Sequence, residues 1–135
     1  MPSDFFRLLF KLQFVVMIGL YSYMGTADVS GTAVENFNDL LLHSMGYFVA
    51  IFSGFLAFHS LKRFFWVVVG LWLFSLFIEI VQYHLPWRSF SLLDLVANSL
   101  GLLVGYGVLW LLKNPILKII GFFDNRVKAS NDVYE

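Results

Sequence analysis

Hydrophobic residues fall into four long runs along this chain, separated by short stretches that are richer in polar residues. Each run approaches the ~20 residues that an α-helix needs to cross the hydrocarbon core of a bilayer. Because backbone groups in lipid have to hydrogen-bond within the segment itself, each run is predicted to be helical. The predicted transmembrane helices span residues 5–24, 39–58, 64–82 and 92–112.

The sequence after the fourth run has a different pattern. Apolar residues are interleaved with Lys118 across residues 115–123, and the chain then becomes polar through Glu135. This pattern is typical of a short helix that lies in the membrane interface and is followed by a frayed tail. We therefore predict an all-α fold, with a single transmembrane domain over residues 1–135. It is a four-helix bundle with a short C-terminal interfacial helix.

The first run also has features of a signal peptide. Arg7 and Lys11 lie near its start, and Gly-Thr-Ala at residues 25–27 resembles a small-residue cleavage site. Its apolar character begins at Phe5 and continues through Tyr23, which is long enough to span a bilayer. We therefore expect an uncleaved transmembrane helix.

Composition also indicates a membrane protein. Of the 135 residues, 59% are hydrophobic and 13% are charged, whereas soluble domains have roughly 45–50% apolar and about 25% charged residues. A single small core could not bury the excess, so the expected surroundings are the lipid bilayer. The formal net charge of zero argues against a nucleic-acid partner. Without cysteine the chain has no disulfide, thiol nucleophile or cysteine-bound metal, and the sequence assigns no cofactor.

Basic residues are distributed unevenly between the two ends of the predicted helices. Eight of the nine lysine and arginine residues belong to one side, and only Arg88 lies in a loop on the other. By the positive-inside rule, both termini are predicted to be cytoplasmic, with the 26–38 and 83–91 loops on the outer side of the plasma (inner) membrane.

A set of polar residues interrupts the apolar runs at one level, near the predicted outer ends of three helices. A carboxylate at mid-membrane costs roughly 2.5–3.5 kcal/mol, and intramembrane ionisable groups mark a functional site by default. The candidate site comprises Asp39, His43, Tyr47, Glu79, Gln82, Arg88, Asp94 and Asn98.

Small residues continue one of these helix faces toward the middle of the membrane. At 100° per residue, the same face of the fourth helix contains Asp94, Asn98, Gly101 and Gly105. Gly101 and Gly105 form a GxxxG pair, which favours close helix packing in lipid. We expect this face to pack against a neighbouring helix and to present the polar groups there.

The order and spacing of these residues resemble the VanZ-like family. The pattern reads D-x3-H-x3-Y from Asp39, E-x2-Q from Glu79 and R-x5-D-x3-N-x2-G-x3-G from Arg88. It spans about residues 20–107, and Leu40 stands where the family usually has lysine. The resemblance implies a small integral membrane protein. It also implies an association with resistance to teicoplanin, a glycopeptide that targets cell-wall precursors.

Two functions of different classes remain open for the polar residues. The first is a site for a lipid-linked or otherwise amphiphilic cell-envelope molecule, in which Arg88 suits a phosphate or carboxylate. Whether such a site is enzymatic stays open, because the sequence shows no nucleophile–base pair. The second is a structural or regulatory membrane partner, in which the cluster only clamps the helices. Arg88 would then pair with Asp94 or Glu79, and Gln82 would exchange amide hydrogen bonds with Asn98.

A divalent metal site is a third interpretation. Its ligands would be Asp39, His43, Glu79 and Asp94, and the i, i+4 spacing of the first two permits it. The nearby Arg88 argues against a cation, so no metal site is assigned. Transport would require oligomerisation, because four helices are too few to enclose a pathway.

Overall fold

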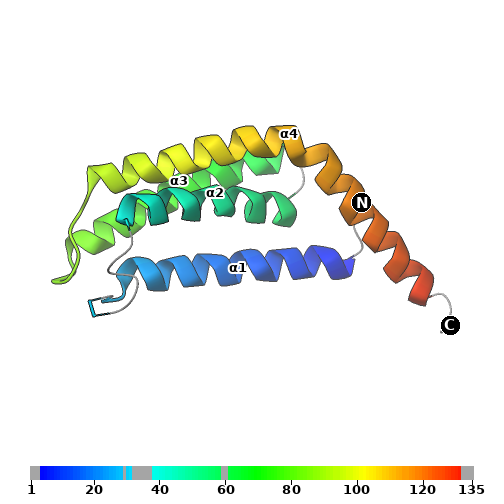
Figure 1. Cartoon of the computed structure of the whole chain (residues 1–135). Helices are drawn as coiled ribbons and strands as arrows, with labels where there is room; N and C mark the ends of the chain where they lie inside the picture. The colour runs from blue at the N-terminus through cyan, green and yellow to red at the C-terminus, as the bar shows by residue number, and fades with distance from the viewer. Residues whose placement is uncertain (1–3, 29, 32–37, 59–60, 132–135) are drawn as a thin grey trace.

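The computed structural model describes residues 4–28, 30–31, 38–58 and 61–131 of the chain. Four α-helices and no strand are present in these ranges (Figure 1). All four are long and apolar enough to cross a membrane, so the prediction of an all-α, four-helix membrane fold is confirmed. The helices are α1 (Asp4–Thr26), α2 (Asp39–Ala57), α3 (Leu61–Tyr83) and α4 (Leu92–Asn131).

Helix α2 lies at the centre of the bundle and contacts α1, α3 and α4. Its contact with α4 is the most extensive in the molecule. A Cβ atom added to Gly101 would overlap the backbone of Ser44, and one added to Gly105 would lie 3.0 Å from the carbonyl oxygen of Phe48. The two glycines therefore allow the α2 and α4 backbones to approach closely, which is how helices pack in lipid.

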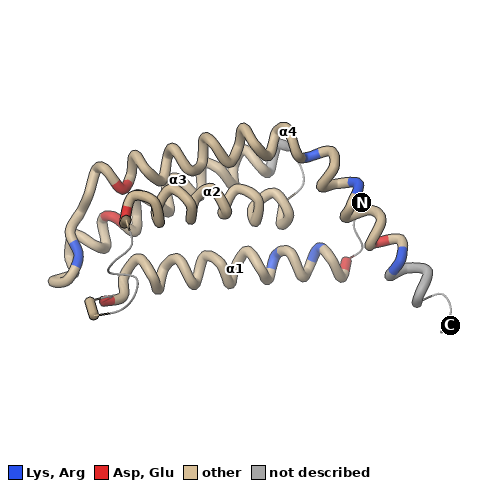
Figure 2. The backbone as a smooth tube through the Cα atoms, viewed as in Figure 1, with Lys and Arg blue, Asp and Glu red and all other residues tan. Residues whose placement is uncertain are grey.

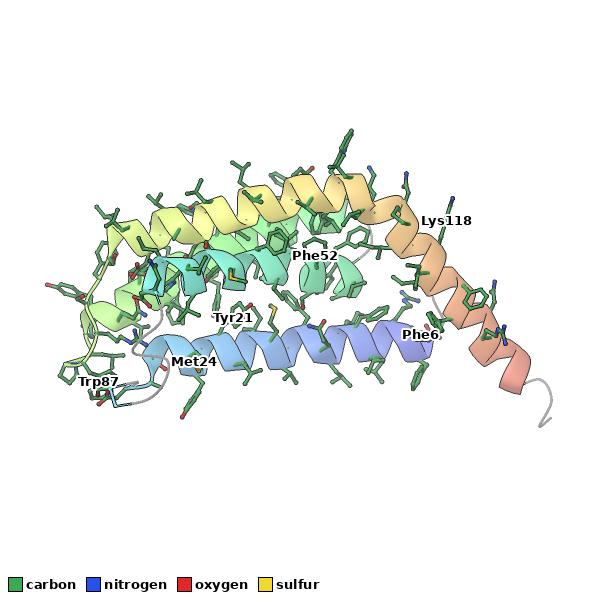
Figure 3. All side chains as sticks on the ribbon, in the orientation of Figure 1. Phe6, Tyr21, Met24, Phe52, Trp87 and Lys118 are labelled. Atoms are coloured by element: carbon green, nitrogen blue, oxygen red, sulfur yellow. The ribbon has the colours of Figure 1, made fainter. Side chains whose placement is uncertain are left out.

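Helix α1 is attached more loosely than the others. Of its residues, only Met17 is buried. Halfway along the helix, Gln13 exchanges two hydrogen bonds with the hydroxyl of Ser53 on α2, at 2.8 and 3.0 Å. Nearer its end, the Tyr21 hydroxyl donates to the carbonyl oxygen of Gly46 (2.6 Å), and Figure 3 shows this side chain directed from α1 toward α2.

The outer surface of the bundle is strongly apolar. Trp66 on α3 and Leu103 and Leu111 on α4 are each more than two-thirds exposed. Contiguous apolar surface of this kind would drive aggregation in water, whereas lipid solvates it. Together with the four long apolar helices, this surface identifies an integral membrane protein.

The C-terminal region departs from the prediction of a separate interfacial helix over residues 115–123. Helix α4 is continuous through this segment to Asn131 and contains Pro115. Figure 1 shows α4 changing direction where it leaves the bundle, and Figure 3 places Lys118 on the segment beyond the bend. Proline lacks an N–H donor and its ring crowds the preceding turn, which kinks a helix without necessarily ending it. The helix predicted over residues 115–123 is therefore present but is not separate from α4, and residues 124–131, predicted as a frayed tail, are helical. The rest of the predicted tail, residues 132–135, lies outside the described residues.

The two ends of the bundle carry different charges (Figure 2). At one end lie the last turns of α1 and α3, the first turns of α2 and α4, and residues 84–91; we call this the polar end. The acidic residues Asp39, Glu79 and Asp94 gather there. Arg88 lies in the connection between α3 and α4, and the other basic side chains that the structure describes lie toward the opposite end, which we call the basic end.

Candidate functional site

Two helix starts position the acidic groups of the polar end. The Asn38 side chain caps α2 by accepting a hydrogen bond from the Leu41 N–H (3.1 Å). The Ser91 hydroxyl caps α4 in the same way, accepting from the Asp94 N–H (3.2 Å). Asparagine and serine are preferred N-caps because their side chains satisfy otherwise unpaired backbone donors. The caps fix the first turns of both helices, and these turns carry Asp39 and Asp94.

His43 lies at the centre of a group of side chains from α2 and α4. Its Nδ1 is 3.1 Å from the side-chain oxygen of Asn98. Its Nε2 faces two carboxylates, at 3.8 Å from Asp39 and 3.7 Å from Asp94. The i, i+4 spacing explains the contact with Asp39, whereas the contacts with α4 arise from the close α2–α4 packing.

A chain of buried hydrogen bonds lies next to this group and joins α2, α3 and α4. The Asn98 amide donates to the Ser75 hydroxyl on α3 (2.7 Å), and Ser75 also hydrogen-bonds to the Tyr47 side chain. All three side chains are buried. Ser75 was absent from the predicted set, although its place four residues before Glu79 puts it on the same face of α3.

Glu79 is fully buried and lies apart from the histidine. Its Oε2 accepts a hydrogen bond from the Ser91 N–H (3.0 Å), which links α3 to the start of α4. Its Oε1 has no hydrogen-bond partner within the described part of the chain. A buried acceptor without a hydrogen bond lowers the stability of the fold by about 1–3 kcal/mol, and by more if the group is charged.

Gln82 and Arg88 contact the last turn of α1. The Gln82 amide donates to the Gly25 carbonyl (2.8 Å), and the Arg88 guanidinium donates to the Met24 carbonyl (3.2 Å). The last carbonyl groups of a helix have no partner within it, so these donors satisfy them. Gln82 Oε1 and Arg88 Nε are buried and lack a hydrogen bond to any residue in the ranges described.

The Trp87 indole completes this contact by donating to the Thr26 carbonyl (3.0 Å), and Figure 3 shows the side chain beside the end of α1.

The pairings expected of a simple clamp differ from those observed. Among residues that the structure covers, Arg88 forms no ion pair with Asp94 or Glu79. The Gln82 amide donates to the Gly25 carbonyl and the Asn98 amide donates to the Ser75 hydroxyl, so the two amides do not bond to each other. The positive charge is therefore held at the end of α1 by a neutral carbonyl.

Two adjoining cavities occupy the polar end. One, of about 320 Å³, lies between the helices and has mostly apolar walls; the other, of about 390 Å³, has mostly polar walls. Three residues, Asp39, Gln82 and Arg88, line both. The apolar cavity also contacts His43, Tyr47 and Asn98, and the polar cavity contacts Asp94. Glu79 lines neither of these two cavities and lies behind them.

The described site presents hydrogen-bond donors and acceptors around the cavities. In the described part of the site, no hydroxyl group hydrogen-bonds to His43, so the arrangement lacks a nucleophile activated by a base. A guanidinium, two amides and two carboxylates instead surround the place where the cavities meet.

A scan against protein-family models matched the VanZ/LLP1 model over residues 5–113. The chain belongs to the VanZ/LLP1 family. The match covers the three helices α1 to α3 and the part of α4 that precedes Pro115, and it therefore includes the whole polar end. The resemblance seen in the residue pattern is confirmed. Searches of curated proteins and of solved structures found no match.

Proposed function

We propose that this VanZ/LLP1-family protein binds the headgroup of a lipid-linked cell-envelope molecule in the outer leaflet of the plasma membrane. The observation that carries the proposal is the meeting of an apolar and a polar cavity at one level of the bundle. An amphiphile has the same division between tail and headgroup. Asp39, Gln82 and Arg88 line both cavities and would contact the headgroup where the tail begins.

Arg88 supplies the positive charge for an anionic headgroup. Its guanidinium has five N–H donors in a planar fork that matches phosphate or carboxylate. The guanidinium donates one hydrogen bond within the described chain, to the Met24 carbonyl, and its Nε is buried without a hydrogen-bond partner there. A phosphate in the polar cavity would provide acceptors for the remaining donors.

The location in the outer leaflet follows from the distribution of basic residues. Lys and Arg flank the membrane helices at the basic end, and the positive-inside rule assigns that end to the cytoplasm. Both termini would then be cytoplasmic, and the polar end would face outward.

A link to glycopeptide resistance is a further part of the proposal and rests on family membership. If the protein sequesters lipid-linked precursors, its expression in a susceptible host will raise the inhibitory concentration of teicoplanin, and Arg88→Ala will not. Equal protection by both proteins at matched abundance would contradict this part.

The alternative is a structural or regulatory membrane partner without a ligand. The hydrogen bonds of Asn98 with Ser75 and of Gln82 with the end of α1 favour it, because they join separate helices. Such interhelical bonds average only about 0.6 kcal/mol. Under this alternative, alanine variants of the site would lower abundance without affecting binding of any headgroup.

Native mass spectrometry of the purified protein tests the proposal. The probes are a polyprenyl phosphate and the uncharged polyprenol with the same tail. We expect the phosphate to bind at least tenfold more tightly, Arg88→Ala to remove most of this difference and Arg88→Lys to retain part of it. Arg7→Ala is the matched control, since Arg7 is an exposed arginine that pairs with Asp4 at the basic end. Equal binding of the two probes by the wild-type protein would overturn the proposal.

A further inference from the structure

The orientation of His43 leaves one ring nitrogen directed at two carboxylates. Because Asn98 presents its side-chain oxygen to Nδ1 at 3.1 Å, Nδ1 carries the proton and donates it. In the neutral ring, Nε2 then has a lone pair. It faces Asp39 at 3.8 Å and Asp94 at 3.7 Å, which is too far for hydrogen bonds.

The same separation is close to that of ligands around a metal ion. Donor atoms about 2.1 Å from a tetrahedral zinc ion lie about 3.4 Å apart. The donor atoms of Asp39, His43 and Asp94 all lie within 4.8 Å of one another. The Asp39 side chain is 58% exposed, so it can move toward the other two ligands without displacing buried neighbours.

Gln82 is an independent indication that the polar cavity suits a ligand. It is 2% exposed, and its Oε1 has no hydrogen-bond partner in the described ranges. With Asp39 and Asp94 it lines the polar cavity. A buried oxygen acceptor without a partner, on a residue that lines the same cavity as two carboxylates, would be satisfied by a cation or a donor in that cavity.

Arg88 lines both cavities, but its guanidinium is not paired with the carboxylates of the cluster. Its guanidinium donates to a carbonyl of α1 and forms no ion pair with the carboxylates that the structure describes. Glu79, the fourth ligand suggested by the sequence, is bonded to Ser91 and lies outside the cluster.

We propose that Asp39, His43 and Asp94 bind a divalent zinc ion at the place where the two cavities meet. Zinc binds histidine nitrogen and carboxylate oxygen, and three protein ligands leave its fourth position open. Asn98 acts as a positioning residue, since its contact with Nδ1 fixes the tautomer that frees Nε2. In a further step, which rests on the proposed function, the open position would bind the phosphate of the headgroup opposite Arg88.

The test is calorimetric titration of the detergent-purified, chelator-stripped protein with Zn²⁺, without lipid. We expect one site per chain in the wild-type protein and a loss of at least tenfold in affinity in Asp94→Asn and His43→Gln. Asp39→Asn should show the same loss, and because this residue is exposed the variant tests the site without disturbing buried packing. Asn98→Ala should weaken binding 10–100-fold.

Asp28→Asn is the matched control. Asp28 is an exposed carboxylate near the polar end, and the hydrogen bonds that Ser30 donates to it lower its pKa, so it is ionised at neutral pH. We expect no change in Zn²⁺ affinity. Substoichiometric binding by the wild-type protein, or full binding by Asp39→Asn and His43→Gln, would overturn the zinc site. Binding of polyprenyl phosphate in the presence of chelator would then still test the proposed function separately.

Discussion

Two interfaces of the bundle join its helices by different means. Between α2 and α4, Gly101 and Gly105 bring the backbones together, and the contact is continuous. Between α1 and the other helices there are a few hydrogen bonds and a cavity of about 320 Å³. At the two glycines the close interface has no room for a ligand, whereas the cavity at the loose interface is lined by the candidate groups other than Glu79 and Asp94. The α2–α4 pair is therefore the scaffold, and α1 covers one side of the candidate site.

The largest effect is expected from Gly101→Leu. A side chain at this position would overlap the α2 backbone at Ser44, which cannot move aside as a flexible side chain can. We expect destabilisation of about 3 kcal/mol or more, at the upper end of overpacking costs. Thermal unfolding in detergent measures it.

Gly107→Leu is the control for this change. A Cβ at Gly107, on the same helix, would meet no atom within 4 Å. Its unfolding temperature should stay close to that of the wild-type protein. Equal loss in both variants would show that a leucine added anywhere on α4, and not the α2–α4 contact, causes the effect.

The second-largest effect is expected from Gly46→Leu, which tests the cavity at the α1 interface. Gly46 lines the apolar cavity, and a Cβ there would make ordinary contact with the Tyr21 ring at 3.6 Å. The larger side chain should fill the cavity and lower polyprenyl phosphate affinity at least tenfold while the protein remains folded. Val49→Leu, on the exposed side of α2, is the control and should bind normally. Unchanged affinity in Gly46→Leu would remove the apolar cavity from the site.

Gln13→Leu should have the smallest effect. It removes the two hydrogen bonds that join Gln13 to Ser53, and interhelical bonds in membrane proteins average about 0.6 kcal/mol. We expect a loss of about 1 kcal/mol in unfolding free energy and no change in headgroup affinity. A loss as large as that of Gly101→Leu would refute the view that α1 is only loosely attached.

The helices and the gathering of polar groups were accessible from sequence for physical reasons. Apolar runs of membrane length have to form helices, because their backbone groups find no other hydrogen-bond partners in lipid. Alternating helix directions then bring the start of α2, the end of α3 and the start of α4 to one level. The bend of α4 was harder to predict, because Pro115 is compatible with either a kink or a helix end.

The partners of each polar atom could not be predicted from the sequence. Ser75 and Ser91 were missed, because a serine in an apolar segment is common and its bond depends on how the helices are rotated. Arg88 and Gln82 were expected to contact side chains, but they donate to backbone carbonyls of α1. Every residue has a backbone carbonyl, so the residue pattern does not indicate which one will accept. Tyr47, by contrast, lies in the site because it follows His43 at i+4 on one face.

The central claim is that an amphiphile enters the space between α1 and α2, and site-specific photocrosslinking tests it most directly. A photoreactive amino acid is placed at Leu42, which lines the apolar cavity, or at Met45, which is 57% exposed on the surface of the same helix. With labelled polyprenyl phosphate in the membrane, the account predicts several-fold more crosslinking at position 42 than at 45, and loss of the excess in Arg88→Ala. Equal crosslinking at the two positions would contradict it.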